Sequence, residues 1–427
     1  MSNEGYNAKS SLDYVGMTDV GMRRANNQDA HILVVADEQE SWENRGHIFM
    51  VADGMGAHAA GELASKLACE GIPTLYFKYQ DDSPPEALKR AIEETNAEVN
   101  RRGDANAEFD GMGTTTSVLA LLPQGVVIGH VGDSRVYRLR GNNLEQLTFD
   151  HSLVWELQAA GEINSENIPK NVITRSLGPY PKVQVDLEGP HPVELLDTFL
   201  LCSDGLSGEV EDDEIAAILA SLPPTEAAEF LINLANLRGG PDNITVIVVK
   251  ATAEDVTSRV AGSKPIVIGA SKEKPNVHPG VWAVTGVCFL TVVVMLLASQ
   301  YFLAICAGVG GIAAILFALY KMVNSGGGGQ TLGNGQRLGK GPYTRTPALA
   351  KAEFISKLVG MLKELREIAE EKGWEIGWPT LDEHCKQAED ASSPPEAVRH
   401  YGRAISFMME EIRQVEARKA SDSTIDY

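Results

Sequence analysis

Aspartates stand at the ends of apolar runs at four places in this chain, each beside a Gly or an Asn that lets the backbone turn sharply. One Asp-Gly pair after a strand usually marks only a hairpin turn. Four such places indicate more, because strands of one sheet, or of two packed sheets, present their ends at a common edge. The aspartates are therefore predicted to converge on one cluster of like charges, formed by Asp53, Asp133, Asp204 and Asp242.

The region between residues 11 and 250 alternates short β-branched or apolar runs with Gly and Asp turns. Two longer stretches, Ala60–Phe77 and Pro84–Arg101, have helical spacing, and Ser83 is a plausible N-cap for the second. The sequence therefore predicts an α+β domain with a strand-rich core and helices at its sides. The runs predicted as buried strands are His47–Ala52, Val126–Val131, Val136–Leu139, Thr198–Cys202 and Ile244–Val249.

A buried cluster of carboxylates is stable only if cations neutralise it, and ligation by oxygen alone selects Mg or Mn over softer metals. Two such ions about 4 Å apart would turn a bridging water into hydroxide and stabilise an in-line attack on phosphorus. The phosphate oxygens also need a cation, and a planar Arg is the usual bidentate partner. Arg24 is the candidate, although alone it would be interpreted as an exposed loop residue. These residues predict hydrolysis of a phosphomonoester.

In this order and combination, the motifs resemble the type 2C protein phosphatases in their bacterial form. That family is magnesium- or manganese-dependent and acts on phosphoserine and phosphothreonine. The resemblance runs from about Asp13 to Lys250, and it implies a β-sandwich of two antiparallel sheets flanked by helices, with the metals at one edge. The motifs are Arg24 with Asn27-Gln28-Asp29, Asp53-Gly54-Met55-Gly56, Gly113-Thr114-Thr115, Gly132-Asp133-Ser134-Arg135, Asp150-His151-Ser152-Leu153, Ser203-Asp204-Gly205-Leu206 and Asp242-Asn243-Ile244-Thr245.

The resemblance also implies a metal-ligand set. Asp53 would bridge two ions and Gly54 would lend its backbone carbonyl to one of them. Asp204 and Asp242 would complete the other ion's ligands. Asp133, together with Asp204, corresponds to positions that bind a third ion in bacterial members.

Other roles follow from the same resemblance. Arg24 would hold the substrate phosphate, Gln28 would act through water, and Asp29 and Asn243 would support the site from behind the ligands. Met55 stands where animal members have a His proposed as general acid, so the leaving group must take its proton from elsewhere.

Two further segments lie near the predicted site in the sequence. His58 follows the Asp53 motif, but a lone His there is more often a packing or helix-start residue. Residues 148–190 resemble the family's flap beside the active site, with a hypothesised role in substrate choice.

A second feature is the run from Val281 to Tyr320, which contains no charged side chain. About 40 residues would make roughly 60 Å of helix, twice the thickness of a hydrocarbon core. Ser299 and Gln300 divide the run, so transmembrane helices are predicted at 281–298 and 301–320; a buried helical hairpin is the alternative. Basic residues on both outer flanks predict a multi-pass membrane protein whose catalytic domain lies in the cytoplasm.

Composition divides the remaining chain. The phosphatase domain is assigned to residues 11–252, and linkers rich in Gly, Ser or Lys are predicted at 253–279 and 324–347. Residues 350–420 show two apolar stripes with helical spacing, which predict an antiparallel helical hairpin that buries its own stripe.

Charge and cysteines limit the partners. A formal net charge of -21 argues against nucleic acid, and five scattered cysteines favour neither disulfides nor zinc. The expected partners are phosphorylated proteins, serine/threonine kinases and a membrane. The main rival is a catalytically weak or regulated binding module that docks kinases through the phosphatase fold and the C-terminal helices; a sensor gated by those helices is a third hypothesis.

Overall fold

The structure is a computed structural model that describes residues 11–57, 59–161, 169, 172–258, 266–268, 279–301, 305, 308–309, 311–312, 315–316, 330–332 and 337–423. The chain divides into two compact units. One combines Met1–Lys264 with Arg337–Tyr427, and the other is Pro265–Gln336. The first unit therefore unites the predicted phosphatase domain with the C-terminal helices.

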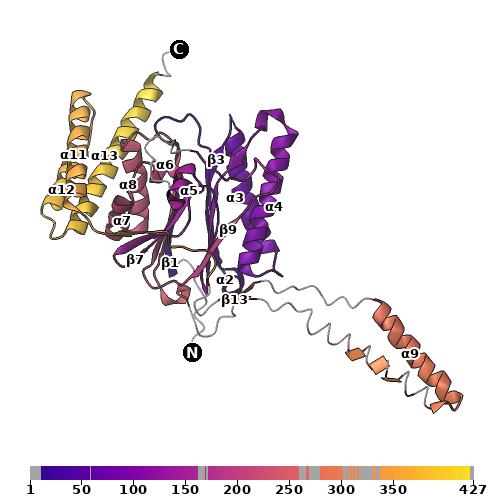
Figure 1. Cartoon of the computed structure of the whole chain (residues 1–427). Helices are drawn as coiled ribbons and strands as arrows, with labels where there is room; N and C mark the ends of the chain where they lie inside the picture. Colours follow the sequence, from indigo (N-terminus) through magenta and orange to yellow (C-terminus); the bar gives the residue numbers. More distant parts are fainter. Residues whose placement is uncertain are drawn as a thin grey trace. The chain divides into compact units, whose positions relative to one another are not determined.

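Two antiparallel sheets form the centre of the first unit (Figure 1). All the apolar runs predicted as strands are strands, and the predicted α+β fold with helices flanking the sheets is confirmed. In spatial order, the first sheet contains β1 (Leu12–Asp19), β11 (Ile244–Ala251), β10 (Thr198–Cys202), β7 (Arg135–Arg140), β8 (Asn143–Gln146) and β14 (Thr344–Pro347). The second contains β2 (Asp29–Val34), β3 (His47–Met55), β5 (Thr116–Leu122), β6 (Gly125–Val131) and β9 (Asp186–His191), with β4 (Gly113–Thr114) paired to β3.

Strand β11 explains why these runs are apolar throughout. Ile247 and Val249 belong to the core that also holds Phe49 and Leu119 of the second sheet. Val246 and Val248 belong instead to the core formed with the helices outside the first sheet. Successive side chains of a strand point to opposite faces, so a strand covered on both faces must be apolar at every position.

Helices α3 (Ala60–Lys78) and α4 (Pro84–Ala105) pack beside the second sheet (Figure 1). Ser83 and Glu86 form a capping box at the start of α4, as the sequence predicted for Ser83. Gly129 of β6 allows α4 to come close, because a Cβ there would stand 2.6 Å from the side chain of Ile92. Shorter helices lie in the connections: α2 (Gln39–Arg45), η1 (Ala107–Phe109), α5 (Leu153–Ala159), α6 (Asp204–Ser207) and η3 (Glu254–Val256).

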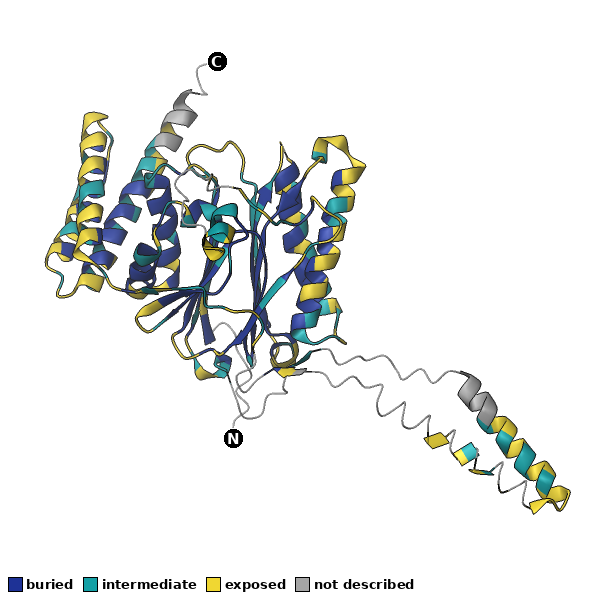
Figure 2. Ribbon diagram, in the orientation of Figure 1, coloured by how far each residue is buried: buried dark blue, intermediate teal, exposed yellow. Residues whose placement is uncertain are grey.

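The outer face of the first sheet carries two layers of helices. Helices α7 (Asp212–Ser221) and α8 (Pro224–Leu237) lie against the sheet, and α13 (Pro394–Ser423) packs on both. Helices α11 (Ala352–Glu371) and α12 (Trp378–Glu389) pack in turn against α13. Buried residues fill this layer as well as the space between the sheets, whereas the outer faces of α11 and α12 are exposed (Figure 2).

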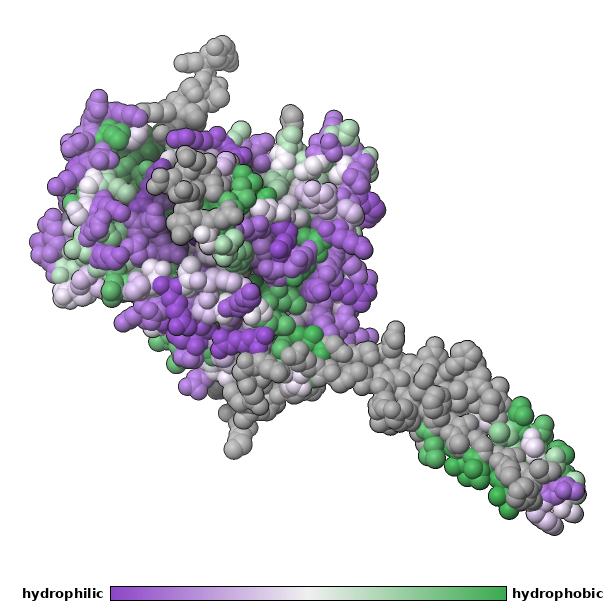
Figure 3. Space-filling model, in the orientation of Figure 1, coloured by the Kyte–Doolittle hydropathy of each residue, from purple (hydrophilic) through white to green (hydrophobic). Residues whose placement is uncertain are grey.

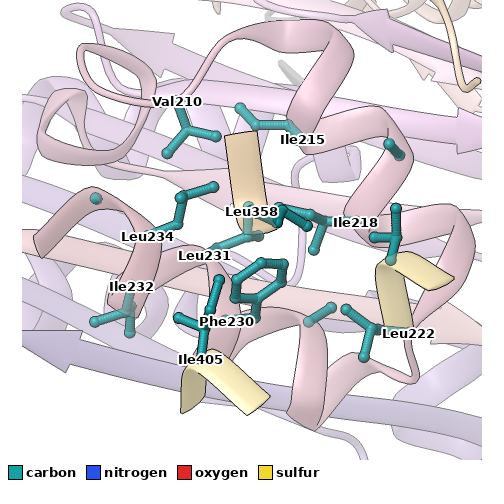
Figure 4. Close-up of a cluster of buried hydrophobic side chains, with 14 of the residues drawn as sticks. Val210, Ile215, Ile218, Leu222, Phe230, Leu231, Ile232, Leu234, Leu358 and Ile405 are labelled. Atoms are coloured by element: carbon teal, nitrogen blue, oxygen red, sulfur yellow. The ribbon is translucent and has the colours of Figure 1, made fainter. Parts of the chain in front are cut away.

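The C-terminal segment differs from the predicted hairpin in two ways. It has three helices in the described residues, because α12 carries a short stripe that includes Leu381 and Ala388. Its apolar stripe is also shared with the catalytic domain: Leu358 and Ile405 lie among side chains of α7 and α8, including Phe230 (Figure 4). An apolar stripe packs against whatever apolar surface is near, and α7 and α8 offer one.

The predicted linkers contain strands. Strand β14, at the end of the 324–347 segment, pairs with β8 and extends the first sheet. In the second unit, β12 (Ile266–Ile268) pairs antiparallel with β13 (Gln330–Leu332). Composition alone gave no signal for these short pairings.

The second unit also contains α9 (Pro279–Leu297), whose described side chains form an apolar surface (Figure 3). The chain turns where the sequence predicted, since Ser299 has a φ of 58°. A crossing takes about 20 apolar residues in one helix, and within the described residues no helix has both the length and the apolar character to make one. The predicted multi-pass membrane location with a cytoplasmic catalytic domain is therefore wrong. Most of 301–320 lies outside the described residues.

Candidate metal centre

Five aspartates gather at one edge of the sandwich, and both sheets contribute. In the second sheet, Asp29 of β2 lies directly opposite Asp53 of β3, and Asp133 follows β6. In the first sheet, Asp204 follows β10 and Asp242 precedes β11. The carboxyls lie near enough for Asp29, Asp133 and Asp204 all to raise the pKa of Asp53. The convergence predicted from the sequence is present.

The backbone around Asp53 is held by the neighbouring strand. The Asp53 amide donates to Thr115 Oγ1 at 2.9 Å, and the Thr115 amide donates to the Asp53 carbonyl at 2.8 Å. Thr114 Oγ1 donates to the same carbonyl at 2.9 Å. Gly54 has no room for a side chain, because a Cβ there would stand 2.1 Å from the Gly61 carbonyl oxygen. The Gly113-Thr114-Thr115 motif thus fixes the residue that the resemblance assigns as the bridging ligand.

Asp29 connects the two sheets. Ser203 Oγ donates to Asp29 Oδ2 at 2.7 Å and accepts the Thr245 amide at 3.0 Å. Burial raises the pKa of Asp29 to about 7, against the lowering effect of hydrogen bonds from Thr245 and Ser203. Asp29 therefore lies behind the cluster and ties its two halves together.

The electrostatics of the cluster favour a cation. Burial, and then the neighbouring charges, raise the pKa of Asp133 to about 8 and that of Asp53 well above its ordinary value; burial also raises the pKa of Asp204. One oxygen each of Asp29, Asp133 and Asp204 is buried without a hydrogen-bond partner among the described residues. Unpaired buried carboxylate oxygens are costly, and a hard cation such as Mg²⁺ or Mn²⁺ satisfies them. The donor set fits these metals.

The cluster is nevertheless not a finished ligand cage. In the part of the chain that the structure describes, no three Asp, Glu, His or Cys side chains are already arranged around one metal position. Asp53 and Asp204 instead lie close enough together for each carboxyl to affect the pKa of the other. A proton between two carboxyls relieves the same repulsion that a cation would relieve, so this arrangement agrees with the raised pKa values.

Arg24 lies in the loop between β1 and β2, at the outer side of the cluster. Its Nη2 is 2.7 Å from Asp242 Oδ2, and its Nε donates to the Pro241 carbonyl at 3.4 Å. The Arg24 side chain is 47% exposed and that of Asp242 31% exposed. The guanidinium is thus oriented by Asp242 while part of it faces solvent.

Asn243 secures this loop at three points. Its Nδ2 donates to the carbonyls of Val20 at 2.8 Å and Asn26 at 3.0 Å, and its Oδ1 accepts the Gln28 amide at 2.8 Å. The residue next to Asp242 therefore holds both ends of the loop that carries Arg24.

The sequence did not predict a partly buried network that lies beside Asp133. The Gly132 amide donates to His151 Nδ1 at 2.9 Å, and His151 Nε2 is 3.0 Å from Asp186 Oδ2. Arg175 binds the other oxygen of Asp186 at 2.7 Å. His151 lies in a quoted motif, but Asp186 begins β9 without any local signal. Of the flap, residues 162–168 and 170–171 lie outside the described residues, as does His58.

The comparisons with known proteins identify the family of this domain. The family model for protein phosphatase 2C matches residues 22–236. The protein phosphatase PhpP of Streptococcus pneumoniae is 38% identical over 249 residues, covering 56% of this chain and 97% of the relative. The serine/threonine phosphatase stp of Listeria monocytogenes is 40% identical over 243 residues, covering 55% and 93%.

A solved structure also matches. The Mycobacterium tuberculosis serine/threonine phosphatase PstP/Ppp is 34% identical with a TM-score of 0.50, covering 57% of this chain and 100% of that one. The fold and the acidic edge define a metal-dependent phosphatase domain, and the chain belongs to the protein phosphatase 2C family. It is a protein serine/threonine phosphatase that uses Mg²⁺ or Mn²⁺.

Proposed function

We propose that this protein hydrolyses phosphoserine and phosphothreonine on other proteins at the acidic edge, with the residues in the roles that the motifs imply. Asp53, the Gly54 carbonyl, Asp204 and Asp242 would hold two ions, and Asp133 would contribute to a third. The observation that carries the proposal is a set of buried, unpaired carboxylate oxygens beside a half-exposed Arg.

When bound, Mg²⁺ or Mn²⁺ supplies Lewis-acid activation of water and positive charge for the phosphoryl group. The protein's own residues position the substrate phosphate and the aspartates. Arg24 offers the N–H groups that face solvent to the phosphate oxygens, while its bond to Asp242 keeps the guanidinium aimed at the cluster. Asn243 limits the movement of the loop that carries Arg24. Asp29 limits the movement of the second sheet relative to the first, through its bond from Ser203. Met55 carries no proton to give, so it takes no part in leaving-group protonation.

The exposure of the site favours a large substrate. Arg24 and Asp242 are both partly open to solvent, so a phosphate on a protein side chain can reach them without entering a deep cavity. We infer that the partners are phosphorylated proteins and the serine/threonine kinases that produce them.

The test uses the full chain with Mn²⁺ and a phosphothreonine peptide. Asp53→Ala should lower kcat/KM by roughly 100-fold or more and weaken Mn²⁺ binding in calorimetry, because a shared ligand is lost. Arg24→Ala should raise KM while Mn²⁺ binding stays near the wild-type value.

Asp110→Ala is the matched control, since Asp110 is an exposed carboxylate outside the cluster, and both readouts should stay unchanged. Equal turnover in wild type and Asp53→Ala would contradict the proposed roles. Mn²⁺ binding with negligible wild-type turnover would favour the regulated binding module instead.

A further inference from the structure

Helix α13 follows α8 toward the active-site loop. Residues that come later in α8 contact residues that come later in α13, so the two helices run in the same direction. The end of α8 leads to Asp242. The contacts are Arg403 to Glu226 at 2.8 and 3.0 Å, and Asn233 Nδ2 to Ser406 Oγ at 3.2 Å.

The packing between these helices is close. A Cβ on Gly402 would stand 2.9 Å from the ring of Phe230, so the glycine allows the two backbones to approach. Ile405 and Met408 are fully buried in the same layer. Interiors packed this closely transmit small displacements, so the position of α13 is tied to that of α8.

Near the end of α8, α13 contacts the strand that leads to Arg24. Arg413 Nη2 is 3.3 Å from Asp19 Oδ2, at the last residue of β1. The other oxygen of Asp19 accepts the Gly21 amide at 2.8 Å and Asn236 Nδ2 at 3.1 Å. One carboxylate thus joins α13, α8 and the start of the loop.

The loop is in turn held against the segment that carries Asp242. Gly21 has a φ of +78°, and a Cβ there would stand 2.1 Å from the Asp242 carbonyl oxygen. The Met22 amide donates to the Gly240 carbonyl at 2.8 Å. A shift of Asp19 therefore moves backbone that is only a few residues from Arg24.

We propose that Arg413 is a positioning residue for Arg24, through which the C-terminal helices strengthen the binding of substrate phosphate. The inference rests on the proposed role of Arg24. It concerns a part of the chain beyond the family match, because 97% of the matched PhpP relative is covered while only 56% of this chain is. Arg413 fixes the Asp19 carboxylate, Asp19 fixes Gly21, and the loop presents the guanidinium.

The experiment measures kcat and KM of the full chain with a phosphothreonine peptide and Mn²⁺. Arg413→Gln should raise KM about two- to fivefold, the range of a partly exposed ion pair, with kcat within about twofold. Arg413→Lys should restore KM. In a chain that already carries Asp19→Asn, adding Arg413→Gln should leave KM unchanged, because both substitutions act on one ion pair.

Arg403→Gln is the matched control, since it removes the same charge from α13 and breaks an ion pair that does not touch the loop. Its KM should stay at the wild-type value. An unchanged KM in Arg413→Gln, or an equal rise in Arg403→Gln, would overturn the inference. An Arg24→Ala variant separates the two proposals. If its KM is unchanged, both the role of Arg24 and the role of Arg413 are overturned. If its KM is raised while that of Arg413→Gln is not, only the role of Arg413 is overturned.

Discussion

The acidic edge and the layer of α7, α8 and α13 both take carboxylates out of water. The helical layer pairs its buried carboxylate with basic side chains, whereas at the acidic edge Arg24 pairs only with the partly exposed Asp242. In that layer Glu214 binds Arg238 at 2.6 and 2.9 Å and Lys357 at 3.3 Å. Burial raises the pKa of Glu214, but the bonds from Arg238 outweigh it and the pKa is lowered. At the acidic edge, burial and like charges raise the pKa of Asp53 and Asp133.

The difference separates residues that hold the fold together from residues kept for a ligand. A paired buried carboxylate stabilises the fold it belongs to once the pair exists, whereas an unpaired one destabilises the fold until something binds. The acidic edge is thus expected to be a weak point of the metal-free protein.

The largest expected effect comes from Asp204→Asn. Turnover with Mn²⁺ should fall by roughly 100-fold or more, because a ligand is lost. The free energy of unfolding in EDTA should stay equal or rise, because one buried like charge is removed. Peptide kinetics and urea unfolding in EDTA measure the two effects.

Glu214→Gln provides the contrast. It should destabilise the protein, because Arg238 loses its partner, and leave kcat nearly unchanged. If Asp204→Asn lowered the metal-free stability as much as Glu214→Gln does, the distinction between the two regions would fail.

The next largest effect concerns packing in the layer of α7, α8 and α13. Phe230→Ala should lower the free energy of unfolding by about 3–5 kcal/mol, because a fully buried ring between α8 and α13 leaves a cavity. Urea unfolding followed by far-UV circular dichroism measures it. Ile368→Ala on α11, at a residue that is 43% exposed, should change stability by only about 0.5 kcal/mol or less. Similar losses in both variants would argue against the docked arrangement of the C-terminal helices.

The smallest effect is a pH dependence that differs between the regions. The pKa of Asp29 is about 7 and that of Asp133 about 8, both raised from 3.8, chiefly by burial. In the metal-free protein their contribution to stability is fully present below about pH 4 and is lost as pH rises through 7 and 8. In the helical layer, burial raises the pKa of Glu214 but the bonds from Arg238 outweigh it, so the pKa is lowered. The contribution of Glu214 to stability is therefore lost only as pH falls through that lowered pKa.

Thermal unfolding in EDTA at pH 5 and pH 8, repeated with Mn²⁺, checks this. At 100 times its Kd, Mn²⁺ should stabilise the protein by about 2.7 kcal/mol. The Kd should be lower at pH 8, where the carboxylates are ionised, so a fixed Mn²⁺ concentration should stabilise the protein more at pH 8 than at pH 5. Asp133→Asn should flatten the pH profile of the metal-free protein. A metal-free protein that became more stable between pH 5 and pH 8 would contradict the raised pKa values.

Much of the site could be predicted because its residues stand in local patterns. The ends of β3, β6 and β10 are visible as apolar runs that stop at an Asp, and both sheets bring those ends to one edge. Asp186 could not be found this way, since it starts β9 within no motif and meets His151 only through the fold. The roles of Arg24, Asp53 and Asp242 as ligands of phosphate and metal stay predictions.

The C-terminal third was predicted less well. Apolar spacing predicted α11 and α13, but it could not predict which surface their stripes would cover. An apolar stripe indicates which face of a helix is buried and not what it is buried against. The run after Val281 is apolar and uncharged, but within the described residues no helix is both long and apolar enough to cross a membrane.

The sequence by itself determined the class of fold, the acidic cluster and the family, because strand periodicity and Asp-turn motifs are local properties of the chain. Only the tertiary structure decided that β14 completes the edge of the first sheet, that α13 lies along α8, and that Arg413 meets Asp19, 394 residues away in the sequence. Contacts of this kind depend on which surfaces and edges remain open once the local elements have formed, and no short window of sequence records that.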